Sequence, residues 1–251
     1  IGFTVTATDQ IANGGGLHWI TYSNSDAGVT APNPTRTDNQ GFFDLTWEYE
    51  FADDLAPVIL NVSNSASQGG NTASLANRGE LDSWGQRWAL AAKGVYATLS
   101  VGGAWASHFG ASSPKWSAYS TLNTPLDVDY VILFDLPSSD ICAGTAVATV
   151  QASMLAAIAK AKTDYPNARI LLTNISPRSD STGTPETNRI TMNNWLASSP
   201  GGVAGCIDIE GPVTDWASPG RIRTRYDSGD GVHGNPAWHA AILDRIPVHR
   251  N

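Results

Sequence analysis

The chain has 251 residues, enough to bury a full hydrophobic core in one domain with an extension or in two domains. Only 15% of the residues are charged, and the abundance of Gly, Ser, Thr, Asn and Ala favours a secreted, virion-borne or cell-surface protein over an intracellular one. The net charge of −8, without a run of Lys or Arg, argues against nucleic acid and anionic membranes as partners. No apolar stretch reaches the roughly 18 residues of a membrane span. Because the chain starts at Ile1 and shows no signal peptide, we expect a processed module of a longer chain or particle.

Residues 1–56 differ from the rest because their apolar residues alternate. In "DLTWEYEF" (residues 44–51) the four apolar side chains share one face of an extended strand, which predicts a half-buried antiparallel strand. "GFTVTAT" (2–8) and "LHWITYS" (17–23) indicate two further short strands, with a Pro- and Asn-containing loop before the last strand. We therefore expect residues 1–56 to form a β-rich N-terminal extension packed on the main domain, with a flexible arm as the alternative.

From residue 57 onward, short apolar strands alternate with longer helical segments. Strands are predicted at residues 57–62, 95–101, 129–136, 168–175 and 205–210. Helices are predicted at residues 80–94, 146–166, 184–198 and 236–246. This alternation predicts a three-layer α/β domain over residues 57–251, with a parallel five-stranded sheet covered on both faces. In such sheets the functional site lies beyond the carboxyl ends of the strands.

The two cysteines give neither a disulfide framework nor a metal-binding spacing. Cys142 should follow the carboxyl end of one strand, whereas Cys206 should precede another strand, so they would lie at opposite ends of the sheet. We therefore expect two free, buried thiols, although one disulfide is the alternative.

A candidate nucleophile follows the first of these strands, in "NVSNSASQGG" (61–70). A serine hydroxyl here would be exposed at the start of a helix, where backbone N–H groups and the helix dipole favour developing negative charge. Ser65 competes with Ser63 and Ser67, and in isolation an ordinary loop serine is the simpler interpretation. A serine hydroxyl also needs a base to become a nucleophile.

The candidate base lies near the other end, in "DSGDGVHGNPAWH" (227–239). Asp230 and His233 are three residues apart in a Gly-rich turn, which lets the carboxylate reach one ring nitrogen while the other faces outward. Asp227, six residues before the histidine, is the rival for the orienting carboxylate. His239 lies in the next helix, and we expect it to pack or cap rather than to act in chemistry.

At these motifs the sequence resembles the SGNH (GDSL-type) esterases and lipases, over roughly residues 57–246. "SNSASQG" (63–69) fits their nucleophile block G-D-S-[IL]-[TS]-x-G, with Ser65 at the nucleophile position, and "DGVHGN" (230–235) fits their D-x-x-H block. "TLSVGGAW" (98–105) is similar to the second block, and "LPSSD" (136–140) stands where G-x-N-D is expected.

The resemblance implies an SGNH-hydrolase-like, flavodoxin-like α/β/α domain that cleaves carboxylic esters through an acyl-enzyme, without metal or cofactor. Ser65 would be the nucleophile, His233 the base and Asp230 the residue that orients the imidazole. The oxyanion hole would comprise the amides of Ser65 and Gly103 and the hydroxyl of Ser139. Gly103 could instead serve only to allow a tight turn.

Several positions depart from the family pattern. Ser63 replaces Gly and Asn64 replaces Asp, but neither family residue transfers a proton. Ser139 replaces an Asn that donates to the oxyanion, so this substitution affects the expected rate more than the mechanism. Gly234 replaces Pro, which we expect to loosen the turn that carries His233.

The substrate class follows from weaker signals. There is no lid-like apolar helix, and Trp105, His108 and Trp116 fall in the loop after the Gly103 block, where they are candidate substrate contacts. We expect short acyl groups and a small ester or acylated carbohydrate as substrate, with carbohydrate O-deacetylation as one form of the activity. The alternative is a weak or inactive SGNH scaffold that binds glycan or serves as a structural module of a larger protein.

Overall fold

A computed structural model describes residues 57–68, 83–92, 94–100, 102–112, 130–180 and 183–246, and the backbone of two short strands. These two strands, β1 (Ile11–Ala12) and β2 (Gln40–Gly41), pair with each other in antiparallel fashion. The three strands predicted within residues 1–56 lie outside the described residues. The division at residue 56 and the packing of an extension therefore stay predictions.

Five parallel strands form the main sheet, as predicted. They are β3 (Val58–Ser63), β4 (Val95–Ser100), β5 (Tyr130–Asp135), β6 (Arg169–Thr173) and β7 (Gly205–Ile207). Their order across the sheet is β4-β3-β5-β6-β7, and each neighbouring pair is parallel. The prediction of an α/β domain built on a five-stranded parallel sheet is thus confirmed.

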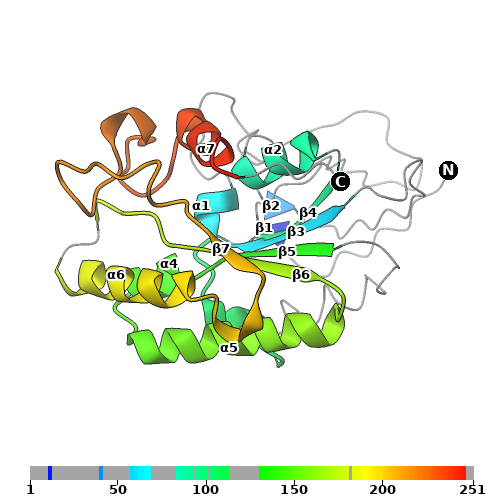
Figure 1. Ribbon diagram of the computed structural model, residues 1–251. Helices are drawn as coiled ribbons and strands as arrows, with labels where there is room; N and C mark the ends of the chain where they lie inside the picture. The colour runs from blue at the N-terminus through cyan, green and yellow to red at the C-terminus, as the bar shows by residue number, and fades with distance from the viewer. Residues whose placement is uncertain are drawn as a thin grey trace, which may run out of the picture.

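Helices cover both faces of this sheet (Figure 1). The α-helices are α1 (Ser65–Gln68), α2 (Trp84–Ala91), α4 (Ser138–Cys142), α5 (Val147–Asp164), α6 (Thr184–Ala197) and α7 (Pro236–Leu243). Short 3-10 helices are η2 (Ala106–Phe109), η3 (Pro200–Gly202) and η4 (Thr224–Tyr226). Helices α2 and α7 lie on one face and α5 and α6 on the other, which gives the three layers. None of the helices in the described part of the chain is long and apolar enough to cross a membrane.

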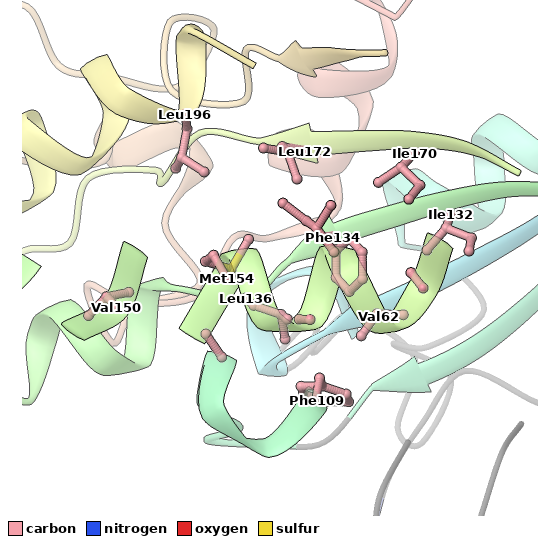
Figure 2. Close-up of a cluster of buried hydrophobic side chains, with 14 of the residues drawn as sticks. Val62, Phe109, Ile132, Phe134, Leu136, Val150, Met154, Ile170, Leu172 and Leu196 are labelled. Carbon is pink, nitrogen blue, oxygen red and sulfur yellow. The ribbon is translucent and has the colours of Figure 1, made fainter. Parts of the chain in front are cut away.

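The strands supply apolar side chains to both layers because successive residues point to opposite faces. Phe134 and Leu172 pack with Met154 of α5 and Leu196 of α6 in one buried cluster (Figure 2). Strand residues of the other parity, such as Ile59, Leu133 and Leu171, face the second cluster, which also contains Trp84 of α2 and Trp238 of α7. Burial on both faces explains why these strands appear in the sequence as continuous apolar runs rather than as alternating patterns.

The strand order marks the carboxyl end of β3 as the expected place for a ligand site. This strand lies between β4 and β5, and the order reverses at β3, as in flavodoxin-like sheets, where ligands bind at the reversal. Ser63 is in register with both Ser100 and Asp135, so the three strands end at the same level. The segments that follow β3, β4 and β5 therefore meet at one edge.

Several smaller expectations can be compared with the structure. Helix α2 begins at Trp84 rather than at residue 80 within the described residues, and β7 ends at Ile207 rather than at residue 210. Helix α4 was not expected. His239 is fully buried and its Nδ1 accepts from the Trp84 amide at 3.1 Å, so it caps α2 as predicted. Burial lowers the pKa of His239 to about 3, and Arg87 adds to this effect.

The two cysteines are not joined in a disulfide, as expected. Each is partly buried rather than fully buried. Cys206 lies within β7 instead of before it, and burial raises the pKa of its thiol to about 12, with a smaller contribution from Asp208 and Asp135. Such a thiol is neutral at ordinary pH and therefore unreactive as a nucleophile.

Candidate active site

Ser65 is the first residue of α1, two residues beyond the end of β3, at the sheet edge where the strand order reverses. Its Oγ lies 2.8 Å from Nε2 of His233, although 168 residues separate the two in the chain. The side chain of Ser65 is neither fully buried nor fully exposed. The fold therefore brings the candidate nucleophile and the candidate base within hydrogen-bond distance.

Asp230 completes a chain of three side chains. Its Oδ2 lies 2.6 Å from His233 Nδ1, and its Oδ1 accepts from the amides of Val232 at 2.9 Å and His233 at 2.8 Å. Partial burial favours the protonated acid, but the hydrogen bonds from the His233 ring and from these two amides outweigh it and hold the pKa of Asp230 well below its usual range.

The ionised carboxylate decides the tautomer of the imidazole. Because a carboxylate can only accept, Nδ1 of His233 carries the proton and donates it to Asp230. In a neutral ring Nε2 then has a free lone pair, so it accepts from the hydroxyl of Ser65. This arrangement can remove the hydroxyl proton as Ser65 Oγ attacks an electrophile.

The turn that carries His233 is held by local hydrogen bonds. Asp227 Oδ1 accepts from the amides of Gly229 and Gly231 at 2.8 and 2.9 Å, so this carboxylate shapes the turn rather than contacting the imidazole. The amide of Ser228 donates to the carbonyl of His233 at 3.0 Å.

Gly234, which stands where the family has proline, lies close to the helix that follows the turn, and its effect on the rigidity of the turn stays a prediction. A Cβ at Gly234 would stand 2.2 Å from Cγ of Trp238, so the chain packs directly against the indole of α7. Only glycine fits this close approach.

The rival serines are buried behind Ser65. Ser63 and Ser67 are both fully buried. The side-chain amide of Asn61 donates to Ser63 Oγ at 3.1 Å and to Ser67 Oγ at 3.4 Å, and Ser63 Oγ also hydrogen-bonds Ser100 Oγ of β4. These two hydroxyls thus belong to a buried polar network that ties β3 to β4, whereas the hydroxyl of Ser65 is hydrogen-bonded to His233.

The structural role of Asn64 was not predicted from the sequence. It is buried, and its Nδ2 donates to the carbonyl of Leu136 at 2.9 Å and to Ser138 Oγ at 2.8 Å, while its Oδ1 accepts from the amide of Ala66 at 3.0 Å. It therefore ties the segment of Ser65 to the segment between β5 and α4. The available signal was the departure from the family Asp, since an amide can donate and accept at once whereas a carboxylate only accepts.

The two other candidate oxyanion donors follow the strands on either side of β3. Gly103 lies in the turn after β4 with φ of +68°, a backbone conformation that favours glycine, and Ser139 lies in the first turn of α4 after β5. The segments of both donors are joined, because the amide of Ala106 donates to Asp140 Oδ2 at 3.0 Å. Burial raises the pKa of Asp140 to about 6, although this hydrogen bond opposes the rise.

The loop after Gly103 presents an aromatic pair. Trp105 is 39% exposed, and its ring is stacked with that of His108 at 6.4 Å between centroids and an interplanar angle of 17°. The amide of Trp105 also donates to His108 Nδ1 at 3.2 Å. Trp116, the third candidate substrate contact, lies outside the described residues. Among the residues that are described, no cluster of His, Cys, Asp and Glu has the arrangement of a metal site.

Comparison with solved structures supports the fold. A member of the lipolytic protein G-D-S-L family from Veillonella parvula DSM 2008 matches with a TM-score of 0.57 and 12% identity, over 76% of this chain and 96% of that one. The psychrotrophic esterase EstA from Pseudoalteromonas sp., in a structure inhibited by monoethylphosphonate, matches with a TM-score of 0.53 and 16% identity, over 75% and 93% of the two chains. No family model and no curated protein matches the sequence. The resemblance to the SGNH hydrolases is thus confirmed at the level of the fold.

Proposed function

We propose that this chain is a serine hydrolase that cleaves carboxylic esters through an acyl-enzyme. The observation that carries the proposal is the hydrogen-bonded chain from Ser65 Oγ through His233 to an ionised Asp230. Ser65 Oγ attacks the ester carbonyl carbon while His233 Nε2 takes its proton. When the tetrahedral intermediate collapses, His233 returns this proton to the leaving alcohol and the acyl group remains on Ser65. Water then repeats the cycle in place of the serine and releases the carboxylic acid.

The oxyanion of each intermediate needs preorganised donors. We assign this role to the amides of Ser65 and Gly103. These residues lie in the segments that follow β3 and β4, and the carboxyl ends of these two strands are in register. Ser139, after β5, adds a hydroxyl that is shorter and freer to rotate than the family amide. Loss of one such donor costs about 2.7–4 kcal/mol of activation free energy, so we expect a modest turnover.

The proposed substrate is an ester of a short acyl group on a small alcohol or sugar, with O-deacetylation of carbohydrate as one form. The support is the half-exposed Trp105, whose stacked pair with His108 presents a flat aromatic surface in the loop next to Gly103. A sugar ring can lie on such a surface, because its C–H groups meet the negative face of the indole.

Hydrolysis of p-nitrophenyl acetate, butyrate and octanoate by wild type and Ser65→Ala tests the proposal. We expect Ser65→Ala to lower kcat by about 10³-fold or more, and kcat/KM to fall from acetate to octanoate. Ser198→Ala is the control, because this exposed serine follows α6 and its hydroxyl donates to the carbonyl of Trp195. Equal turnover by wild type and Ser65→Ala would refute the proposal.

A second candidate function is a glycan-binding or structural module on an esterase scaffold that has lost its activity. The observation that favours it is Ser139 at the position of the oxyanion asparagine. A purely binding protein has no need of the Ser65–His233–Asp230 chain, which makes this candidate the weaker one. A serine-directed organophosphonate separates the two functions, because only an activated serine forms a phosphonyl adduct.

A further inference from the structure

The structure contains a pocket whose lining includes none of the three candidate catalytic residues. It is a depression of about 280 Å³ between the loop after β7, η4 and the last turn of α7. We call it the arginine–tryptophan pocket; the lining residues used below are Trp216, Arg223, Arg225, Tyr226, Asp244 and Arg245. Its η4 segment directly precedes the turn that carries His233, and Arg245 follows the last turn of α7.

The arginines of this pocket are not neutralised by carboxylates within the described residues. Arg223 Nε donates to the carbonyl of Thr214 at 2.7 Å, and Arg225 Nη2 donates to the hydroxyl of Tyr226 at 2.6 Å. Both partners are uncharged. With Arg245 the pocket has three guanidinium groups and one carboxylate, that of Asp244.

Two other arginines of the chain have acidic partners. Arg189 is buried and paired with Glu186 and Glu210, and Arg178 forms a two-bond pair with Asp180. In a chain with a net charge of −8, acidic partners are abundant. Three arginines that converge on one pocket without them are thus arranged to attract an anion.

The aromatic residues of the pocket point to the kind of anion. Trp216 is 63% exposed, which leaves a large apolar surface in water. The guanidinium carbon of Arg225 lies 4.5 Å from the centroid of the Tyr226 ring, so this arginine is held in place by stacking. An exposed indole beside preorganised guanidinium groups suits a ligand with one flat C–H face and one planar carboxylate.

We propose that the arginine–tryptophan pocket binds an acidic saccharide. The carboxylate of a uronate residue accepts from the guanidinium groups, and the C–H face of the sugar ring lies on Trp216. A bare phosphate would use the arginines but leave Trp216 without a partner, and a lipid chain would find too polar a lining. This site is independent of the proposed ester hydrolysis, because none of its residues belongs to the Ser65–His233–Asp230 chain.

Isothermal titration calorimetry of the full chain carrying Ser65→Ala tests this site without turnover. The probes are a hyaluronan tetrasaccharide, which contains glucuronate, and the same tetrasaccharide with its carboxyl groups reduced to alcohols. We expect the uronate form to bind at least tenfold more tightly than the reduced form, and this difference to shrink as salt is raised.

Variants then locate the binding. Trp216→Ala and Arg245→Gln change exposed residues, and we expect each to weaken tetrasaccharide binding about tenfold without altering the midpoint of thermal unfolding. Arg169→Gln is the matched control, because it removes an exposed arginine at the amino end of β6, whereas the pocket follows the carboxyl end of β7. This variant should leave binding unchanged.

Three results would overturn the proposal. One is equal affinity, or no measurable affinity, for the uronate and reduced forms. Another is unchanged affinity in both Trp216→Ala and Arg245→Gln. The third is inorganic phosphate that binds as tightly as the tetrasaccharide and competes with it, which would indicate a simple anion site. All of these readings concern binding by a Ser65→Ala protein, so they stand whether or not the chain hydrolyses esters.

Discussion

The two ends of the Ser65–His233 contact are supported in different ways. Behind Ser65 lies a buried network of side chains, in which the Asn61 and Asn64 amides connect β3 to β4 and to the segment after β5. His233 lies in a partly exposed turn whose hydrogen bonds are mostly local, between the carboxylates of Asp227 and Asp230 and amides a few residues away. The position of the serine thus depends on tertiary packing, whereas that of the histidine depends on turn chemistry. Substitutions at the serine end should change stability and activity together, whereas those at the histidine end should change mainly activity.

The largest expected effect comes from the histidine end. Asp230→Asn keeps an oxygen for the Val232 and His233 amides, but its NH₂ group faces Nδ1 and favours the tautomer with a proton on Nε2. That nitrogen can no longer accept from Ser65, so kcat for p-nitrophenyl acetate should fall by about 10⁴-fold. In Asp227→Asn the oxygen that accepts from Gly229 and Gly231 is retained, so the loss should stay within tenfold. Similar losses in the two variants would contradict the assignment of Asp230.

A stability effect at the serine end comes next. Asp135, the last residue of β5, is buried; burial raises its pKa from 3.8 to about 6, although hydrogen bonds from Thr173 and Ser67 oppose the rise. Since the folded state holds this proton more tightly than the unfolded chain, the contribution of Asp135 to stability is present in full below pH 4 and is lost as the pH rises through about 6.

In Asp135→Asn the side-chain amide does not ionise, so the stability lost in wild type as the pH rises is retained. We expect the free energy of unfolding in urea to exceed that of wild type by about 2–3 kcal/mol at pH 8 and to match it at pH 4. A variant that is less stable than wild type at pH 8 would show that the ionised carboxylate stabilises the fold.

The Asn64 contacts make a change toward the family sequence unfavourable. Asn64→Asp replaces an amide that donates to the Leu136 carbonyl and to Ser138 by a group that only accepts. This leaves a buried carbonyl unpaired and should lower the free energy of unfolding by about 1–3 kcal/mol in urea denaturation at pH 8, with a parallel loss of kcat. Asn64→Asp as stable as wild type would mean that the bridge to the β5–α4 segment is dispensable.

The smallest expected effect is an increase in kcat. Ser139→Asn restores the longer, planar amide donor of the family at the first turn of α4. We expect kcat for p-nitrophenyl acetate to rise about tenfold with little change in KM, because the added interaction forms only with the oxyanion. Ser139→Ala should lower kcat. If neither variant alters kcat, the side chain at this position does not face the oxyanion.

The sheet was predictable because its strands are buried on both faces. "VILFD" in β5 and "RILLT" in β6 are apolar runs that only a covered parallel sheet accommodates, and the intervening helices are long enough to recognise. Helix α4 was missed since it spans only five residues of mixed polarity, too short for a periodic pattern.

Within the site, local spacing was readable from the sequence but long-range pairing was not. The three-residue step from Asp230 to His233 predicts their contact within one turn. The bridge from Asn64 to Ser138 arises only when two separate segments pack, and no spacing in the chain encodes it.

The central claim is that Ser65, and no other serine, is activated by His233. The most direct measurement is the intact mass of the protein after treatment with a p-nitrophenyl alkylphosphonate, followed by peptide mapping. The account predicts one phosphonyl group on Ser65 in wild type and in Ser67→Ala, and none in Ser65→Ala or His233→Ala. An adduct on a different residue, or a wild-type protein that stays unlabelled, would contradict it.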